Sequence, residues 1–240
     1  MQKTHMLFEE DQYKRQASAR VALSNDEGIV LDATVFYPVG GGQPGDQGHL
    51  LLPDGRELRI VDTVRSQSNP FMIVHIPEQP ITLPPGMEVM AHIDWERRYR
   101  HMRMHTCLHL LCAVVRAPVT GCGISADKGR LDFDLPEPTV DKEAITEQLN
   151  ALIGCEIPVH TRWVDEKELE SSPRVVSASS INTPQYDRKV RLVEVQGIDV
   201  QPCGGTHVSN TAEIGIVRCQ KIEKKSRHNR RIVVEFNDAL

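Results

Sequence analysis

Residues 94–116 read DWERRYRHMRMHTCLHLLCAVVR, a run without Gly or Pro that predicts a long helix. Asp94 can cap its start, because a carboxylate accepts hydrogen bonds from the free N–H groups of a first turn. His105 and His109 are four residues apart, so both imidazoles leave the same face of this helix. One helix can offer two metal ligands in this way, although such a pair is also common among ordinary core and surface histidines.

A second pair follows in residues 201–210, QPCGGTHVSN. Cys203 and His207 are again four residues apart, but Gly204 and Gly205 between them favour a loop whose backbone approaches another group closely. A thiolate and imidazoles suit zinc, so the two pairs together predict one Zn²⁺ per chain, bound by His105, His109, Cys203 and His207.

The spacing leaves some points of this site open. Cys112 lies three residues after His109 on nearly the same helix face and could replace one ligand, although we favour a core position for it. Four protein ligands would close a structural site, whereas a catalytic zinc needs a free position for water. Thr106, Cys107 and Leu108 separate the two helix histidines, so the glutamate base of the H-E-x-x-H metalloproteases is missing.

The residues before this helix predict a small β-barrel or sandwich. Short alternating segments run through residues 17–89, and turn signals at 25–28 and 54–55 predict hairpins. The proline-rich piece PITLPPG, residues 80–86, marks a boundary. We therefore expect a barrel domain at 1–90 and a second domain at 91–240.

The second domain combines helices with antiparallel strands. Besides the long helix, we expect helices at 139–153, ended by Gly154, and at 165–171. The segments RLDFDL, EIPVHTRWV, VRLVEV, IGIVRCQKI and RRIVVEF alternate as strands of a largely antiparallel sheet packed by helices. The fold class is thus α+β, with a small N-terminal β-barrel followed by an α/β domain.

Composition narrows the functional classes. The chain has 240 residues, 40% of them hydrophobic, and a net charge of −5. No run of about 18 apolar residues predicts a membrane span. The polar N-terminus lacks the apolar core of a secretory signal, and the six scattered cysteines do not resemble a disulfide scaffold, so we expect a cytoplasmic protein with reduced thiols.

Two local basic runs interrupt the acidic background. They lie at the start of the long helix and in KIEKKSRHNRRI, residues 221–232. Such runs are usually solvated faces or pair with acids, but here both are close in sequence to the predicted ligands, and phosphate contacts would explain them. The residues predicted to contact RNA are Arg97, Arg100, Lys224, Lys225, Arg227, Arg230 and Arg231.

A glycine-rich stretch, FYPVGGGQPGDQG at residues 36–48, formally contains the dinucleotide fingerprint G-x-G-x-x-G. Its context does not fit, because Pro44 lacks an amide donor and residues 45–48 continue as a turn instead of opening a helix. We therefore expect no nucleotide cofactor, and we read this stretch as a barrel turn.

The motifs together resemble one family. HTCLH followed by CGGTH is similar to the editing domain of alanyl-tRNA synthetase and to the freestanding alanyl-tRNA editing (AlaX) proteins. PVTG with RLDFDL, QPCGGTHVSNTAEIG, KIEKKSRHNRRI and FYPVGGGQPGDQG match the same family in the same order, over nearly the whole chain. The Gly-Gly-Thr between Cys and His favours the alanine branch over the related threonyl-tRNA synthetase editing domain, and the two-domain layout resembles the medium-length form.

The resemblance implies a zinc-dependent aminoacyl-tRNA deacylase. It would act in trans and without ATP, as a monomer, hydrolysing the ester that links serine, or else glycine, to alanine tRNA. Zinc on all four ligands or a subset would position and activate water. An apolar pocket made for alanine rejects serine only modestly, because serine differs by one hydroxyl. A second, hydrolytic site that recognises this hydroxyl can correct the error.

The resemblance also implies further site residues. Thr120 falls where the family has a residue facing the aminoacyl group and could bond the serine hydroxyl. Asp199, just before the CGGTH loop, could orient a ligand imidazole, or it could equally be an ordinary surface or turn residue. The residues expected to line the substrate pocket are Thr106, Thr120, Gly41, Gly42, Gln43, Gly204 and Gly205.

Two other functions stay open from the sequence. One is a non-catalytic, zinc-stabilised RNA-binding module, which would release no amino acid. The other is a general zinc hydrolase on small esters or peptides, whose activity would not depend on tRNA.

Overall fold

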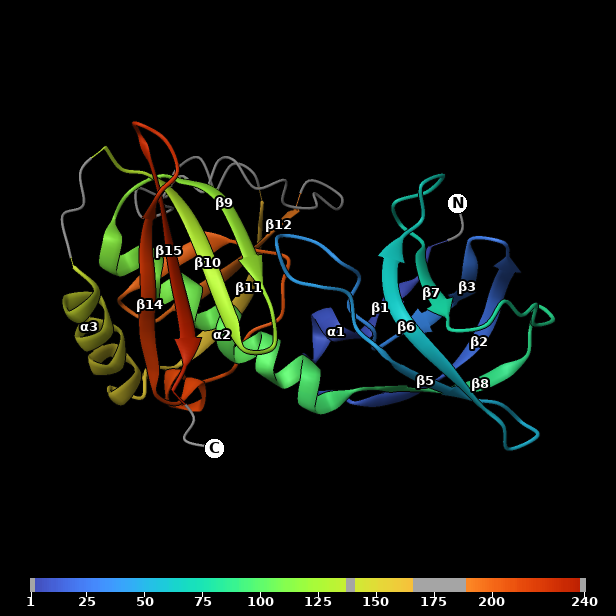
Figure 1. Ribbon diagram of the computed structural model, residues 1–240. Coiled ribbons are helices and arrows are strands. Elements are labelled where there is room, and N and C mark those ends of the chain that lie inside the picture. Colours follow the sequence, from blue (N-terminus) through green and yellow to red (C-terminus); the bar gives the residue numbers. More distant parts are fainter. Residues whose placement is uncertain (1–2, 137–140, 166–188, 238–240) are drawn as a thin grey trace. The chain divides into compact units, whose positions relative to one another are not determined.

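The computed structural model describes residues 3–136, 141–165 and 189–237 (Figure 1). The chain forms two compact units. The first contains Met1–Gly40 and Pro44–Tyr99, and the second contains Gly41–Gln43 and Arg100–Leu240. The division therefore falls within helix α2 (Trp95–Val115), and a short piece of the glycine-rich stretch belongs to the second unit.

The first unit is built on a closed barrel of antiparallel strands in the order β2-β3-β7-β6-β5-β8. The strands are β2 (Gln16–Asn25), β3 (Gly28–Leu31), β5 (Gly48–Leu51), β6 (Glu57–Arg65), β7 (Ile73–Pro77) and β8 (Glu88–Ile93). Both predicted hairpin turns are confirmed, because they connect β2 to β3 and β5 to β6. Residues 80–86 connect β7 to β8, so the boundary expected after residue 90 falls inside a barrel strand.

The barrel interior is apolar and well covered. Alternating side chains of the strands point inward, and Ile29, Leu31, Leu50 and Ile60 are fully buried there. A short parallel pair, β1 (His5–Met6) with β4 (Ala33–Thr34), and helix α1 (Leu7–Glu10) complete the described part of this unit.

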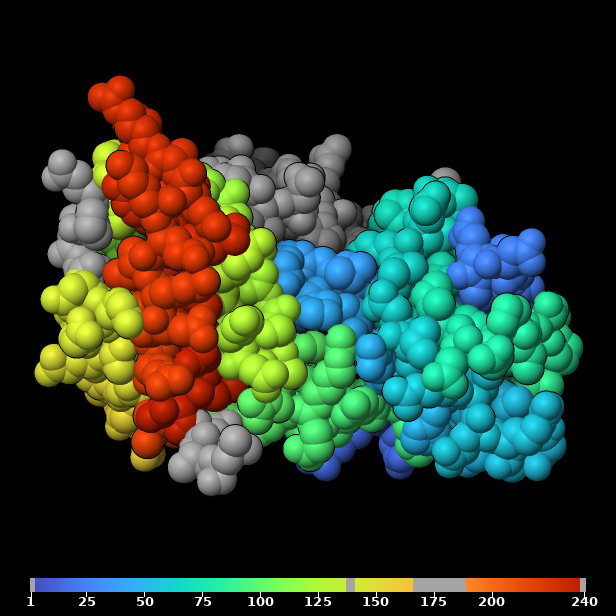
Figure 2. Space-filling view, in the orientation of Figure 1, coloured from blue at the N-terminus to red at the C-terminus, as the bar shows by residue number. Residues whose placement is uncertain are grey.

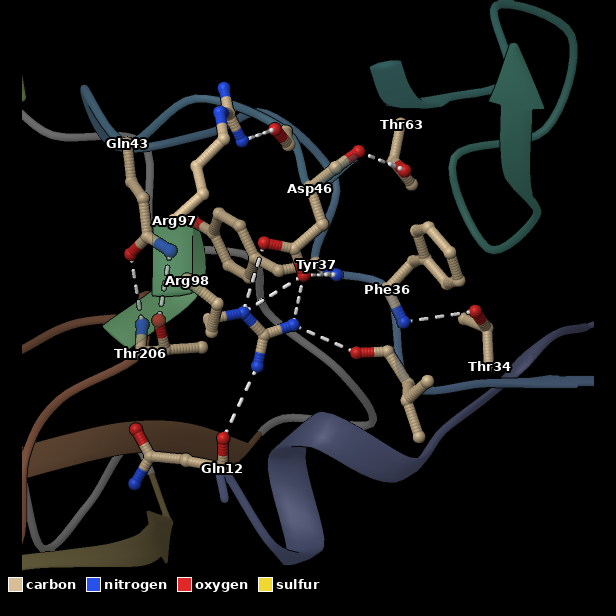
Figure 3. A network of polar contacts seen from close by, with 12 residues as sticks. Gln12, Thr34, Phe36, Tyr37, Gln43, Asp46, Thr63, Arg97, Arg98 and Thr206 are labelled. Carbon is tan, nitrogen blue, oxygen red and sulfur yellow. Dashed lines mark hydrogen bonds and ion pairs between the residues drawn. The ribbon is translucent and has the colours of Figure 1, made fainter. Parts of the chain in front are cut away.

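A buried ion pair fixes the end of the glycine-rich stretch within the first unit (Figure 3). Arg98, fully buried, donates from Nε to both carboxylate oxygens of Asp46 at 3.0 and 2.8 Å, and from a terminal nitrogen to Val35 O at 2.8 Å. Asp46 also accepts from Tyr37 N at 2.7 Å, and its backbone oxygen accepts from Thr63 Oγ1 at 2.8 Å. These contacts compensate both charges for the loss of water.

In its described residues, the second unit contains two antiparallel sheets instead of the single sheet expected from the sequence. The first has the order β14-β15-β10-β9, with β14 (Val217–Lys224), β15 (Asn229–Phe236), β10 (Lys128–Asp134) and β9 (Val119–Ile124). The second has the order β11-β12-β13, with β11 (Val159–Asp165), β12 (Lys189–Val195) and β13 (Asp199–Pro202). Strand alternation identifies the strands but not their partners, which explains the difference.

Helix prediction was accurate where the caps are clear. Helix α2 begins directly after Asp94, whose carboxylate accepts from Arg97 N at 3.1 Å. Helix α3 (Lys142–Gly154) is capped by Asp141, so it begins later than predicted and ends at the expected glycine. A 3₁₀ turn, η1 (Thr211–Ile214), follows the CGGTH loop. The helix expected at 165–171 lies outside the described residues, apart from Asp165, which ends β11.

Helix α2 lies close against the four-stranded sheet. A Cβ at Gly129 of β10 would come within 2.9 Å of the Met104 side chain, so this glycine permits the close approach. Met102, Met104, Leu110 and Leu111 are buried completely, together with polar residues on the same helix. Buried polar side chains require partners, and these partners define the site described below. None of the helices in the described ranges combines the length and apolar character that crossing a membrane would take.

Candidate metal centre

Four side chains of the second unit converge on one point. They are His105 and His109 of α2, with Cys203 and His207 of the loop after β13. Their ligand atoms all lie within 4.8 Å of one another. The Cys203 Sγ atom is 3.4 Å from Nε2 of both His105 and His207. This group can hold one metal ion.

Each imidazole has a partner for its other nitrogen. His109 Nδ1 lies 3.2 Å from the Asp199 carboxylate, and His105 Nδ1 lies 3.0 Å from Gln43 Oε1. His207 Nδ1 lies 3.1 Å from the hydroxyl of Thr106. A partner on Nδ1 fixes the ring orientation and directs Nε2 toward the centre, as is typical of metal-binding histidines.

The Thr106 hydroxyl also determines the protonation of its histidine. It donates its single proton to Met102 O at 3.0 Å and accepts from Val208 N at 3.2 Å. The remaining lone pair can therefore only accept, so His207 carries its proton on Nδ1 and presents a bare Nε2. Thr106 is fully buried with all these contacts made, so its hydroxyl supports a ligand histidine.

Electrostatics favour a thiolate at the centre. Burial alone would raise the pKa of the Cys203 thiol, but its interactions with the neighbouring imidazoles of His105, His207 and His109 outweigh burial, and the pKa lies well below its usual range. Burial holds the pKa of His207 well below its usual value, which keeps this imidazole neutral. Burial also acts to lower the pKa of His109, but hydrogen bonds to Asp199 and Cys203 prevail and raise it to about 10.

The donor set fits zinc. One thiolate and three imidazole nitrogens match the ligands and the number that Zn²⁺ prefers, and metal binding would displace the proton from His109 Nε2. Cys112 is outside the cluster and only partly buried, in the wall of a hollow, so the core position that we favoured is not confirmed; burial raises the pKa of its thiol to about 12.

The loop that carries Cys203 is tied to the sheet by a buried arginine. Arg191 of β12 donates to the carbonyl oxygens of Cys203 and Gly205, each at 2.8 Å. Gly205 N approaches Cys203 Sγ at 3.4 Å, a contact that stabilises a thiolate. The sequence reasoning missed Arg191, although a charged residue within the apolar strand VRLVEV was a signal for it.

The glycine-rich stretch reaches the same unit through residues 41–43. Ile124 N of β9 donates to Gly42 O at 2.9 Å, and the Cys122 thiol donates to Gly41 O at 3.1 Å. Gly42 has φ +82°, and a Cβ there would collide with Cys122. Gln43 is fully buried, so its side chain contacts the cluster and not a substrate.

The other predicted pocket residue, Thr120, lies on an exposed part of β9. Its hydroxyl donates to Asp132 O at 3.1 Å and accepts from Asn229 Nδ2 at 2.7 Å. The described contacts therefore join Thr120 to the sheet and not to the metal ligands.

Several of the predicted RNA-contacting arginines have protein partners. Arg230 is buried and donates to the carbonyl oxygens of Ser226, Asn229 and Pro136, so its guanidinium is held by protein acceptors. Arg231 binds the Asp132 carboxylate with two hydrogen bonds of 2.6 and 2.8 Å.

The two helix arginines also have protein partners, each within its own unit. Arg97 donates to Gly45 O at 2.7 Å. Arg100 donates to Ala126 O at 2.7 Å and pairs with Asp127 at 3.1 Å.

The turn between β14 and β15 is different. Lys224, Lys225 and Arg227 are exposed there, and the turn projects from the surface in the space-filling view (Figure 2). Lys225 makes only a 3.4 Å pair with Glu223. This turn is therefore a charged surface available to a polyanion.

The described part of the second unit includes hollows of two different kinds. One, of about 730 Å³, is mainly apolar and lies between the end of α2, α3 and the β12–β13 turn, with Cys112 and Asp199 in its wall. The other, of about 370 Å³, lies beside Gly42. Its lining includes Lys128, Arg130, Lys221 and Arg231, so it is rich in cationic groups.

Comparison with known proteins gives two matching family models. The model for "Threonyl and Alanyl tRNA synthetase second additional domain" matches residues 190–233, which include Cys203 and His207. The model for "tRNA synthetases class II (A)" matches residues 2–97.

Relatives of two kinds, freestanding editing proteins and a much longer ligase, are more than a third identical to this chain. "Alanyl-tRNA editing protein AlaX-M" of Methanosarcina barkeri is 36% identical, with 98% of this chain and 100% of the relative covered. The protein of the same name from Methanosarcina acetivorans is 37% identical with the same coverage. "Alanine--tRNA ligase" of Metallosphaera sedula is 37% identical over 92% of this chain, but over only 25% of the ligase.

Proposed function

Because this chain belongs to the family of alanyl-tRNA editing proteins, we propose that it hydrolyses the ester bond of mischarged alanine tRNA in trans. The observation that carries the proposal is the convergence of His105, His109, Cys203 and His207, with each histidine held through Nδ1. The substrate places this activity in the cytoplasm, and the reaction needs neither ATP nor a partner subunit.

The metal of this centre is zinc, one ion per chain, with the three imidazoles and the thiolate, or a subset of them, as its ligands, because a catalytic zinc needs a free position for water. Bound zinc supplies a Lewis acid for the ester carbonyl and lowers the pKa of a water molecule. Cys203 is the one ligand that is partly exposed, whereas the three histidines are buried. The substrate ester therefore approaches from the side of Cys203 and Gly204.

Glycines form the wall of the substrate pocket. The backbone of Gly41, Gly42, Gly204 and Gly205 lines this pocket, and the open space beside Gly41, where a Cβ would meet nothing within 4 Å, leaves room for the terminal adenosine and its aminoacyl group. The exposed hydroxyl of Thr120 accepts a hydrogen bond from Asn229. When substrate binds, the hydroxyl of serine takes the place of Asn229 as the donor. Alanine forms no such bond and is hydrolysed slowly, which protects the correct product.

The tRNA backbone lies along the cationic surface of the second unit. Lys224, Lys225 and Arg227 on the projecting turn contact phosphates, and the hollow beside Gly42 accepts the phosphates nearest the aminoacyl end. Arg231 lines this hollow while bound to Asp132, so it contributes charge with a fixed orientation.

Deacylation of alanine tRNA charged with serine, glycine or alanine tests the proposal. Release of serine, and more slowly of glycine, should exceed the rate without protein, whereas alanine should stay attached. Cys203→Ala should abolish the release because it removes the thiolate ligand. No acceleration with zinc supplied would leave a non-catalytic RNA-binding module, and equal hydrolysis of small serine esters would indicate a general esterase.

A further inference from the structure

Gln43 is buried in the second unit between the two ligand-bearing segments (Figure 3). Its Oε1 atom accepts from Thr206 N at 3.0 Å and lies 3.0 Å from His105 Nδ1. Its Nε2 atom donates to Thr206 Oγ1 at 2.8 Å. One side chain thus contacts a predicted ligand on α2 and the residue next to another ligand, His207.

These contacts fix the proton on His105 without reference to a metal. A backbone N–H can only donate, so the atom of Gln43 facing Thr206 N must be the amide oxygen. His105 Nδ1 faces the same oxygen and must therefore carry a proton. The neutral ring then has a bare Nε2, the nitrogen that lies 3.4 Å from Cys203 Sγ.

We propose that Gln43 is a positioning residue for the metal centre. It holds His105 in the Nδ1–H form with Nε2 toward the metal, and it ties the CGGTH loop to this histidine. This inference rests on the metal centre of the proposed function, but it assigns to the glycine-rich stretch a role in assembling the centre and not only in shaping the pocket.

The neighbouring glycines fit this role. Gly42 accepts a hydrogen bond from Ile124 N and has no space for a Cβ beside Cys122. Gly205 is equally restricted, because a Cβ there would run into the His105 ring. The small residues thus let two backbone segments approach closely enough for the Gln43 amide to bridge them.

Zinc affinity tests the proposal, measured by competition with a chromogenic chelator. Gln43→Leu removes the acceptor and leaves two buried N–H donors unpaired, so we expect affinity to fall about 10- to 100-fold. Gln43→Glu keeps an acceptor for both donors and should bind zinc within about threefold of the parent or more tightly. Gln47→Leu, four residues later in the stretch and outside the centre, should match the parent.

The tautomer itself can be observed in the zinc-loaded parent by ¹H–¹⁵N spectroscopy of the histidine rings. The proposal predicts a protonated Nδ1 and a zinc-bound Nε2 for His105. Zinc bound through Nδ1, or a Gln43→Leu affinity within threefold of the parent, overturns the inference. A parent that binds no zinc overturns the metal centre as well, so the two failures are distinguishable, and the spectrum decides even if Gln43→Leu does not fold.

Discussion

Gly205 has no space for a side chain. A Cβ at this position would collide with the His105 imidazole and lie 3.0 Å from Gln43 Oε1. The ring and the amide cannot both move aside, because each has a hydrogen-bond partner that fixes it. The glycine pair in CGGTH therefore allows the loop to approach the helix, in addition to giving it conformational freedom.

The residue scale gives a direct prediction for this glycine. Gly205→Ala should weaken zinc binding at least about tenfold, because the added methyl group displaces a ligand imidazole. Gly154→Ala is the matched control, since a Cβ at Gly154 meets nothing within 4 Å. Chelator competition on both variants checks this, and unchanged affinity in Gly205→Ala would contradict the described loop geometry.

His75 provides a pH-dependent prediction in the barrel. Burial lowers its pKa from 6.5 to about 4, although its hydrogen bond to Ile29 O opposes the shift. A depressed folded-state pKa makes protonation favour unfolding, so the stability from neutral His75 is complete above pH 6.5 and is lost as pH falls toward 4. The loss reaches about 3 kcal/mol by linkage.

Ring ¹⁵N chemical shifts during a pH titration measure the His75 pKa directly. We expect the imidazole to remain neutral at pH 5.5, with its proton on Nδ1, because Thr34 Oγ1 lies 2.7 Å from Nε2 and donates to it. Titration near the ordinary histidine value would show that the ring is solvated, contrary to the structure.

At the scale of elements, the first turn of α2 holds the loop that precedes β5. Arg98 and Asp46 are both buried and pair within the first unit (Figure 3). Removing one charge of such a pair leaves the other without compensation. The pair therefore accounts for an Asp in the turn sequence QPGDQG, which the glycine pattern alone did not explain.

Asp46→Asn should lower the free energy of unfolding by about 3–5 kcal/mol, because it leaves the buried charge of the Arg98 guanidinium without a compensating carboxylate. Urea unfolding followed by tryptophan fluorescence measures this change. Asp54→Asn removes a carboxylate from an exposed pair with Arg56 and should leave the midpoint unchanged. Equal midpoints for parent and Asp46→Asn would contradict a structural role for the pair.

Elements with strong local signals were predictable. Asp94 caps the start of α2 and Gly154 ends α3 as expected, and the two four-residue spacings identified the residues that converge. Asp199 was also predicted as a partner of a ligand imidazole, and it binds His109. The caps and the four-residue spacings depend on neighbours in the sequence, and the chemistry of the two ligand pairs indicated that they meet.

Features that depend on distant partners were not predictable. Gln43 contacts His105 and Thr206, residues far along the chain, so nothing near Gln43 indicated its burial. Thr106 was expected to face substrate, yet its hydroxyl bonds His207. The split of the expected single sheet also depends on which strands pair, which alternation does not specify.

At the scale of the whole molecule, a net charge of −5 must coexist with binding to a polyanion. The structure concentrates exposed cations on the β14–β15 turn, while Arg230 and Arg231 near it are bound to protein acceptors. Binding should therefore depend on few phosphate contacts, and its affinity should fall only moderately as the salt concentration rises.

Replacing Lys224, Lys225 and Arg227 together by Ala should raise KM for charged tRNA and make KM depend less on salt. With fewer phosphate contacts, binding releases fewer counterions. The maximal rate should stay near that of the parent, since the turn is outside the metal centre. Arg56→Ala, on the first unit, is the control. Kinetics at several salt concentrations measure KM and the maximal rate of the triple variant and of the control. An unchanged KM in the triple variant would mean that the RNA binds elsewhere.

Metal removal and restoration test the central claim most directly. Release of serine from serine-charged alanine tRNA should stop in chelator-treated protein and return with one equivalent of Zn²⁺, with metal content measured on the same samples. The Cys203→Ala variant should not recover with the same addition. A full rate of serine release in protein shown to be free of metal would contradict the account.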